Sequence, residues 1–240
     1  MAHLEAVKPK SGLPIHEEPQ HSYTPPLPPP PPPSRLYLDE SIYEQEKQKI
    51  FYCNWHYAGH LSQLNKPGDY LTATVADESI FIVRGQDDTL RGFYNVCRHR
   101  AHQLLEGSGN TRNIVCPYHA WSYALDGELR HARISEKVPG FDKSEFCLQP
   151  VQVDTLCDLV FFNLDPDAES LDSQAPGLAQ DLQERIPELR ANCEQPTRIS
   201  PRSDPATMSA NWKVVVDNFL SNATTALLAH PEFATLVRHV

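Results

Sequence analysis

The sequence predicts an α+β fold in which a compact antiparallel β domain is followed by mostly helical chain. Short β-rich runs fill residues 68–165 and are separated by turn signals such as Pro-Gly, Gly-Ser-Gly-Asn and Asp-Gly. The 240 residues are 40% hydrophobic, which is enough for one or two domains with real cores. A proline-rich stretch precedes the β region, and helical apolar spacing follows it.

Residues 1–35 form the first predicted segment, a disordered proline-rich arm that ends in PPLPPPPPPS at Pro25–Ser34. Each proline fixes φ and lacks a backbone donor, so the stretch favours an extended and solvated conformation. We interpret the arm as a stiff tether, and the alternative is a ligand for a proline-binding module.

A short helix is expected at the start of the ordered chain, in YLDESIYEQEKQKIFYCNW. Ser41 and Glu44 have the spacing of a capping box. The apolar residues that fit a buried stripe on this helix are Ile42, Ile50 and Phe51.

Six strand-like runs follow, namely DYLTATVA, SIFIVRG, LRGFYNV, NIVCP, WSYALDG and LVFFNLD. Beyond them, GLAQDLQERIPELRANC is predicted to be helical as far as Pro187, because proline interrupts helices. The later stretch NWKVVVDNFLSNATTALLAHPEFATLV indicates a strand or helix entry followed by helix.

Composition narrows the class of protein. The 21 basic against 31 acidic residues give a net charge of −10, and no dense block of Lys or Arg indicates nucleic acid as a partner. The first 20 residues have no apolar core of signal-peptide length, and no segment approaches 18 consecutive apolar residues. We therefore expect a soluble cytoplasmic protein without a membrane contact, whose six cysteines are thiols or metal ligands.

Two cysteine-histidine pairs carry the chemistry, in NVCRHRAHQ and VCPYHAW. Each pair follows a predicted strand, so two loops are expected to face one another across a small inorganic centre. A Cys2His2 zinc finger places both cysteines before both histidines, whereas here the order alternates. The four candidate ligands are Cys97, His99, Cys116 and His119.

Alternation suits a centre with two unlike metal positions, where each loop gives a thiolate to one iron and an imidazole to the other. This is the Rieske [2Fe–2S] arrangement, and neutral imidazoles raise its potential to roughly −150 to +300 mV. Pro117, Tyr118 and Trp121 are expected to shield the centre, and Gly107 and Gly109 to let the intervening loop fold over it.

Two other interpretations of the four residues are a Cys97–Cys116 disulfide with surface histidines, or a small zinc site. The sixteen residues between His99 and Cys116 and the Pro-Tyr-His-Ala-Trp context favour the cluster. The remaining cysteines have no matching histidine spacing and are expected to be buried small hydrophobes, namely Cys53, Cys147, Cys157 and Cys193.

A family resemblance rests on these motifs. FYNVCRHRAHQL and NIVCPYHAWSYALDGEL resemble the Rieske domain of Rieske non-heme iron oxygenase alpha subunits, and SANWKVVVDNFL resembles the entry into their mononuclear iron domain. The likeness runs from about Leu36 to Phe233 and is greatest to the choline, carnitine and glycine betaine monooxygenases. Ala101 and Ala120 stand where that family usually has glycine.

The resemblance implies a Rieske domain with an N-terminal helix over 36–165. It further implies that 166–240 is the start of a truncated, helix-grip-like α+β catalytic domain, which would hold non-heme Fe(II) on two histidines and one carboxylate. His230 matches the second histidine, but the first would fall on Thr225 or Ala226, and the bridging carboxylate on Ser221 or Asn222. Two nearby acids, Asp217 and Glu232, are interpreted as solvated or capping groups.

Two functions follow from the resemblance. One is an alpha-subunit-like monooxygenase of small quaternary ammonium compounds, which takes electrons from a ferredoxin-like or flavin reductase and assembles as a homotrimer. The other is an electron-transfer or regulatory Rieske module without its own oxygenase activity. The proline-rich arm adds a weaker third idea, docking to a partner through an aromatic groove.

Overall fold

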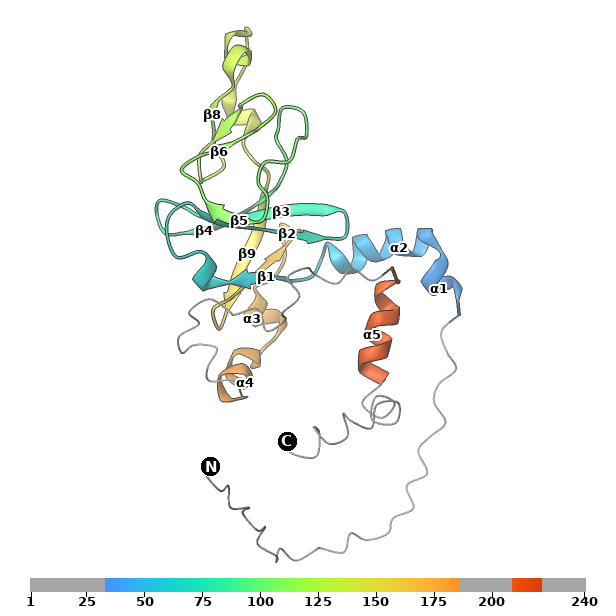
Figure 1. Ribbon diagram of the computed structural model, residues 1–240. Coiled ribbons are helices and arrows are strands. Elements are labelled where there is room, and N and C mark those ends of the chain that lie inside the picture. The colour runs from blue at the N-terminus through green and yellow to red at the C-terminus, as the bar shows by residue number, and fades with distance from the viewer. Residues whose placement is uncertain (1–32, 186–208, 222–240) are drawn as a thin grey trace, which may run out of the picture.

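The computed structural model describes residues 33–185 and 209–221, and two antiparallel sheets form its β domain (Figure 1). The larger sheet has seven strands in the order β1-β10-β9-β4-β3-β2-β5, and the smaller has three in the order β6-β7-β8. The strands are β1 (His56–His60), β2 (Asp69–Val75), β3 (Glu78–Arg84), β4 (Leu90–Tyr94), β5 (Ser108–Asn110), β6 (Ile114–Val115), β7 (Ser122–Tyr123), β8 (Leu129–His131), β9 (Pro150–Leu156) and β10 (Leu159–Asn163). The predicted antiparallel β domain is confirmed.

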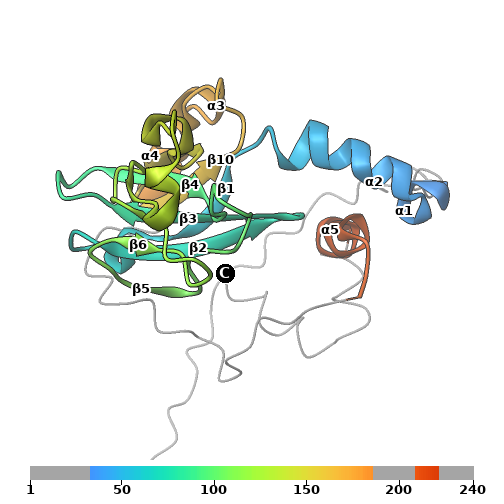
Figure 2. The ribbon, with the colours of Figure 1, turned by 90° about the horizontal axis from the view of Figure 1, so that it is seen from above.

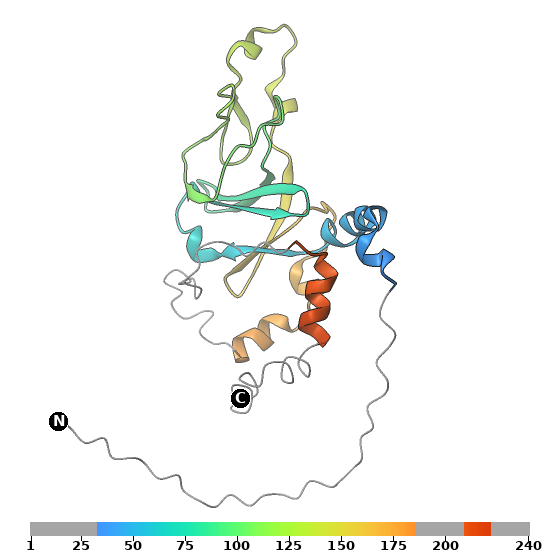
Figure 3. The same ribbon diagram turned by 45° about the vertical axis from the view of Figure 1, so that its right-hand side comes forward.

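The helices lie outside the sheets. Figure 2 shows α1 and α2 extending beyond the strands with α5 beside them, and Figure 3 shows α4 and α5 below the larger sheet, away from the small one. The helical segments are α1 (Arg35–Leu38), α2 (Glu40–Glu46), the π-helical turn η1 (Lys47–Phe51), the 3-10 turns η2 (Leu61–Gln63), η3 (Arg133–Lys137) and η4 (Lys143–Phe146), then α3 (Leu171–Gln174), α4 (Leu178–Arg185) and α5 (Trp212–Ser221).

Strand β3 divides the interior into two hydrophobic cores. Successive side chains of a strand point to opposite faces, so Ile80 and Ile82 enter one core while Phe81 and Val83 enter the other. All four are completely buried, which explains why SIFIVRG is a continuous apolar run. The core on the side of Phe81 also contains the two cysteines of the paired motifs, so the candidate site rests directly on the fold.

All six predicted runs contain strands, but four strands were not predicted: β1, β5, β8 and β9. Strand β1 has the sequence HYAGH, which lacks the alternation of a half-buried strand. Its Gly59 packs so closely that an added Cβ would lie 2.9 Å from Leu71 Cδ2. Such a strand forms because β10 pairs with it, and this is a property of the tertiary fold.

The N-terminal helix differs from its prediction. Asp39, not Ser41, is the N-cap, and its carboxylate accepts hydrogen bonds from the Ser41 backbone N–H and hydroxyl at 2.9 and 2.7 Å. The predicted apolar stripe is right for Ile42 and Phe51, which are half-buried, and wrong for Ile50, which is 38% exposed. The π-helical turn after Glu46 has more residues per turn than an α-helix, which moves Ile50 off the predicted stripe.

The second half agrees with the helical predictions where it is described. Leu178–Arg185 and Trp212–Ser221 are helical, while Pro187 lies outside the described residues. Nearly all of the proline-rich arm, together with Cys193, Thr225, His230 and Glu232, lies outside the described residues. Within the described ranges no helix is long and apolar enough to span a bilayer.

Candidate metal centre

Two loops with the same backbone hydrogen bonds carry the predicted ligands; we term them the first loop, Cys97–His102, and the second loop, Cys116–Trp121. In the first, Cys97 N–H donates to the carbonyl of His102 at 2.8 Å, and Ala101 N–H donates back to the Cys97 carbonyl at 2.9 Å. In the second, Cys116 N–H donates to the carbonyl of Trp121 at 2.8 Å, and Ala120 N–H donates back to the Cys116 carbonyl at 3.0 Å. The loops are therefore closed in the same way.

Each loop turns at an alanine in the left-handed region. Ala101 has a φ of 54° and Ala120 has a φ of 57°. A side chain in this region costs about 1–2 kcal/mol relative to ordinary backbone, which is why glycine is the usual residue there. The two alanines occupy the positions at which the resembling family has glycine, and the loops keep the glycine-type conformation in spite of the added methyl groups.

Both cysteine thiols are buried in the core between the two sheets. Cys97 and Cys116 are each 2% exposed, and neither forms a disulfide. This contradicts the alternative of a Cys97–Cys116 disulfide. Burial raises the pKa of the Cys97 thiol, because a thiolate loses its hydration there. A bound metal would reverse this preference by coordinating the thiolate.

Tyr123, which the sequence analysis missed, is the closest polar neighbour of the thiols. Its hydroxyl lies 3.2 Å from Cys97 Sγ and accepts a hydrogen bond from the Arg98 backbone N–H at 3.1 Å. Either group could donate while Cys97 is a thiol, but a metal-bound thiolate can only accept, so the tyrosine proton would then point at the sulfur. The ring is completely buried, and burial raises the pKa of Tyr123 so that the hydroxyl stays protonated. Its position in strand β7, seven residues after Cys116, was the available signal.

The two imidazoles face one another beside the thiols. The ring centroids of His99 and His119 are 4.8 Å apart at an interplanar angle of 70°. The Nδ1 atom of each ring is buried without a hydrogen-bond partner in the described structure. Burial lowers the pKa of His99, and the neighbouring charge of His119 lowers it further, which favours the neutral ring that binds metal.

Trp121 shields the site as predicted, whereas Pro117 and Tyr118 do not bury it. The indole of Trp121 is 3% exposed and stacks on His99 at 4.7 Å and 10°. Tyr118 contacts the His119 ring with centroids 3.7 Å apart, but it is 57% exposed, and Pro117 is exposed as well. The outer rim of the second loop is consequently open to solvent.

The glycines expected to fold over the centre have another role. Gly107 has a φ of 62° and its carbonyl accepts a hydrogen bond from Thr72 N–H at 2.8 Å. Gly109 pairs with Tyr70 in the β2–β5 ladder, and an added Cβ would lie 3.0 Å from the Tyr70 hydroxyl. The segment between the loops is thus tied to the edge of the larger sheet.

The remaining described cysteines were wrongly expected to be buried. Cys53 is exposed, and Cys147 and Cys157 are partly exposed. Cys53 follows the π-helical turn and donates to the Gln48 carbonyl, while Cys157 forms part of the turn between β9 and β10. The Cys157 thiol donates to the Ala179 carbonyl of α4 at 3.5 Å, so hydrogen bonds rather than full burial hold Cys53 and Cys157.

The residues of the paired loops fit a [2Fe–2S] cluster. Two buried thiols and two buried, unpartnered imidazole nitrogens form one cluster of donors, and thiolate with imidazole is the ligand set that such a cluster requires. A groove of about 470 Å³ opens beside them, lined by His99, His119, Trp121 and residues 132–135. Within the described ranges, no three His, Cys, Asp or Glu side chains are arranged to hold a single metal ion.

The predicted second iron site is mostly outside the described residues. Ser221 is the last residue that the structure describes, and Asn222 lies outside the described residues. Asp217, interpreted above as a solvated or capping acid, is exposed and also accepts a hydrogen bond from the Tyr37 hydroxyl at 2.7 Å. It thereby joins α5 to the N-terminal helix.

Comparisons with known proteins agree with this geometry. Residues 54–142 match the family described as Rieske [2Fe-2S] domain. The carnitine monooxygenase oxygenase subunit of Escherichia coli K12 is 42% identical over 221 residues, which are 92% of this chain and 55% of that protein. The chloroplastic choline monooxygenase of Beta vulgaris is 31% identical over 216 residues, 90% of this chain and 46% of that protein.

Solved structures give the same likeness in three dimensions. A quaternary ammonium Rieske monooxygenase in complex with its substrate L-carnitine superposes with a TM-score of 0.73 and 38% identity, over 84% of this chain and 55% of that chain. The chain therefore spans about half the length of the curated relatives it matches.

Proposed function

The chain is a member of the Rieske oxygenase alpha-subunit family, in the branch of the carnitine, choline and glycine betaine monooxygenases. From this premise we propose that its [2Fe–2S] cluster is held by the four donors of the paired loops, Cys97, His99, Cys116 and His119. The observation that carries the proposal is the pair of buried Nδ1 atoms that lack any other partner beside two buried thiols.

A bound [2Fe–2S] cluster supplies one-electron acceptance and donation at the raised potential of mixed thiolate and imidazole ligation. The chain's own residues prepare that site. Trp121 fixes the orientation of the His99 ring by stacking, and the Tyr123 hydroxyl points its proton at Cys97 Sγ. The half-buried histidine rings line the open groove, so they offer the shortest route between the buried centre and a docked partner.

We extend the proposal to the reaction. The chain acts as the Rieske-bearing part of a monooxygenase of small quaternary ammonium compounds, takes electrons from a ferredoxin-like or flavin reductase, and passes them to non-heme iron in a homotrimer. Its 42% identity to a carnitine monooxygenase oxygenase subunit supports this. Residues 166–240 would begin the helix-grip-like iron domain, and the helical start at Trp212 supports that assignment.

A second function, an electron-transfer or regulatory module without oxygenase chemistry, is favoured by one observation. Thr225 and Ala226 occupy the positions at which the first iron-binding histidine is expected, and neither side chain replaces an imidazole. The two functions differ in the number of irons per chain, because only the oxygenase needs a third.

Metal analysis tests the ligand set. The chain, reconstituted anaerobically, should bind two irons and two sulfides, and Cys97→Ser or Cys116→Ser should abolish binding because a thiolate is lost. Cys147→Ser is the matched control and should retain the cluster. His99→Cys or His119→Cys should leave a cluster with a lower potential and a changed EPR spectrum. A single tightly bound zinc without visible absorbance would contradict the ligand set.

Oxygen consumption separates the two functions. With a competent reductase and carnitine, choline or glycine betaine, the module predicts a reduced cluster and no substrate-coupled uptake of O₂. Steady product formation together with a third iron per chain would instead establish the oxygenase. Restoring one histidine by Thr225→His should not create turnover, because a three-ligand iron site needs its carboxylate too.

A further inference from the structure

The groove beside the paired loops has positive charge at its rim. Arg100 and Arg133 line this groove of about 470 Å³ together with His99 and His119, and we call it the basic groove. Arg98 lies between them in the chain, directly before His99 in the first loop, and all three arginines are exposed. A molecule that approaches the two histidines therefore meets guanidinium groups first.

The fold does not neutralise these arginines. Within residues 33–185 and 209–221, no carboxylate pairs with Arg98, Arg100 or Arg133. Elsewhere in the β domain, by contrast, Arg91 pairs with Asp87 at 2.7 Å. The charges beside the groove are therefore available to a partner.

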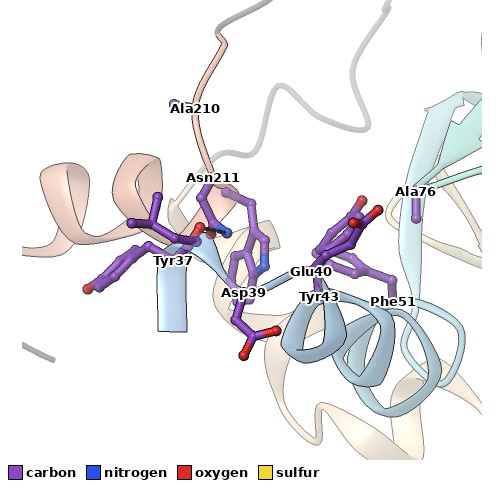
Figure 4. Close-up of a pocket in the computed structure, with 10 residues that line it drawn as sticks. Tyr37, Asp39, Glu40, Tyr43, Phe51, Ala76, Ala210 and Asn211 are labelled. Carbon is purple, nitrogen blue, oxygen red and sulfur yellow. Dashed lines mark hydrogen bonds between the residues drawn. The ribbon is translucent and has the colours of Figure 1, made fainter. Parts of the chain in front are cut away.

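A cavity between the N-terminal helices and α5 has the opposite arrangement (Figure 4). Its volume is about 550 Å³, and the rings of Tyr43 and Trp212 contribute to its wall. Lys47 Nζ lies 5.3 Å from the ring centroid of Tyr43, and Lys213 Nζ lies at the same distance from Trp212. Both ammonium groups also pair with carboxylates. The cations beside that cavity are thus partnered within the fold, whereas those of the basic groove are not.

Charge is divided unequally along the chain. Residues 97–137, which contain both loops and the small sheet, carry six Lys or Arg against four Asp or Glu, a net of +2. The rest of the chain carries 15 against 27, a net of −12, and residues 150–184 contain eight Asp or Glu and no Lys or Arg. Helices α3 and α4 of this acidic segment lie across the larger sheet from the small one (Figure 1). A partner with an acidic face is therefore attracted to one end of the β domain and repelled by the other.

An apolar side chain lies among the charges. Ile134 lines the basic groove and is 80% exposed. Protein interfaces combine an apolar centre with a polar rim, and weak electron-transfer encounters bury less than about 1,200 Å² in all. A small apolar contact surrounded by arginines is sufficient for an encounter of that kind.

We propose that the basic groove docks an acidic face of a protein electron donor. Arg100 and Arg133 bind carboxylates of the donor, because a guanidinium group matches a carboxylate in geometry and charge, and Ile134 adds apolar contact. One electron then leaves the reduced donor, which is oxidised, and reduces the cluster beside the groove. The inference rests on the proposed function, since it requires a [2Fe–2S] cluster held by His99 and His119.

Calorimetric titration of the full-length chain with an acidic plant-type [2Fe–2S] ferredoxin tests the docking itself. Both proteins carry a net negative charge, so binding governed by net charge would be weaker at low ionic strength. Docking on the basic groove predicts the opposite, with tighter binding at about 0.05 M salt than at about 0.5 M, because salt screens the local attraction. Tighter binding at high salt, or no detectable binding, would overturn the inference.

Charge-reversal variants locate the contact. Arg133→Glu and Arg100→Glu should each weaken ferredoxin binding about tenfold at low salt. Arg35→Glu is the matched control, since it makes the same change in net charge at an exposed residue of α1, and it should alter the affinity by less than about twofold. Equal losses in Arg133→Glu and Arg35→Glu would show that net charge and not the groove decides binding, which would overturn the inference.

Stopped-flow mixing with reduced ferredoxin gives a second readout, because the potential of such a donor lies below that of a Rieske centre. The rate of cluster reduction should fall in Arg133→Glu at low salt and converge with that of the unmodified chain at high salt. A difference that persisted at high salt would trace to a changed reduction potential and would count against docking. Full reduction by dithionite counts the clusters present, so a missing cluster, which contradicts the proposed function, is distinguishable from failed docking.

Sedimentation velocity tests the competing occupant, a second copy of this chain. Arg133→Glu should leave the oligomeric state unchanged, because a donor docks on the basic groove only transiently. If the variant dissociated an oligomer that the unmodified chain forms, the groove would be an interface between copies and the inference would be wrong.

Discussion

The first and second loops share a backbone but not an environment. Both close with the same pair of hydrogen bonds and turn at a left-handed alanine. Cys97 and His99 of the first loop are contacted by buried rings, Tyr123 and Trp121, while the second loop presents Tyr118 to solvent. Trp121 ends the second loop and Tyr123 follows it, so one segment provides both a ligand pair and the packing of the other pair.

This asymmetry has a physical cause. Tyr123 lies in the short strand β7 and Trp121 directly before it, and both belong to the core beneath the site. Phe141 and Phe146 contact the edge of Trp121 at centroid distances of 5.8 and 5.5 Å, which extends the support into the chain after the small sheet. The two loops therefore have equivalent backbones, although the aromatic side chains beside them contribute unequally to the stability of the fold.

The largest loss of stability is expected from Trp121→Ala, which removes the ring that stacks on His99 of the first loop. Removal of a buried indole should lower the free energy of unfolding by about 3–5 kcal/mol, because a cavity is left in the core. Urea denaturation followed by circular dichroism measures it. A loss below about 1 kcal/mol would show that the core does not depend on this ring.

Tyr123→Phe should have the next largest effect, confined to the first loop. Loss of the hydroxyl leaves Arg98 N–H and Cys97 Sγ without their shared partner and should cost about 1–3 kcal/mol. The reduction potential should fall, because the hydroxyl proton stabilises the more negative reduced centre. Protein-film voltammetry measures the potential, and Tyr57→Phe, at an exposed tyrosine, serves as the control.

Glycine substitutions test whether the two backbones are equivalent. Ala101→Gly and Ala120→Gly should each stabilise the chain by about 0.5–1 kcal/mol, since relief of left-handed strain exceeds the added entropy of the unfolded chain. Thermal unfolding of the two variants should agree closely. Ala73→Gly, within strand β2, is the matched control and should destabilise by a similar amount. If one of the two glycine substitutions stabilised the chain and the other destabilised it, the two loop backbones would not be equivalent.

The smallest effect is expected from Tyr118→Ala, in the solvent-exposed rim of the second loop. This ring is 57% exposed, so its loss should change the free energy of unfolding by no more than about 0.5 kcal/mol. The same denaturation assay gives the comparison with Trp121→Ala. A cost similar to that of Trp121→Ala would remove the contrast between the loops.

The sequence alone determined the parts of this protein that depend on local pattern. Four alternating ligands predicted the metal centre, because ligand chemistry requires particular side chains at particular spacings. The antiparallel β domain followed from short β-rich runs between turn signals, and the stretch GLAQDLQER was predicted as the helix that α4 forms. These features are set by residues close together in the chain.

Only the tertiary structure decided the features that need distant partners. Strand β1 forms because β10 lies beside it, and Ile50 is exposed because a π-helical turn rotates it outward. The approach of Tyr123 to Cys97 joins residues 26 positions apart, and the hydrogen bond from Asn211 to the Tyr37 carbonyl joins residues 174 positions apart. Such contacts depend on how separate elements pack, since burial and pairing are properties of the assembled chain and not of any one segment.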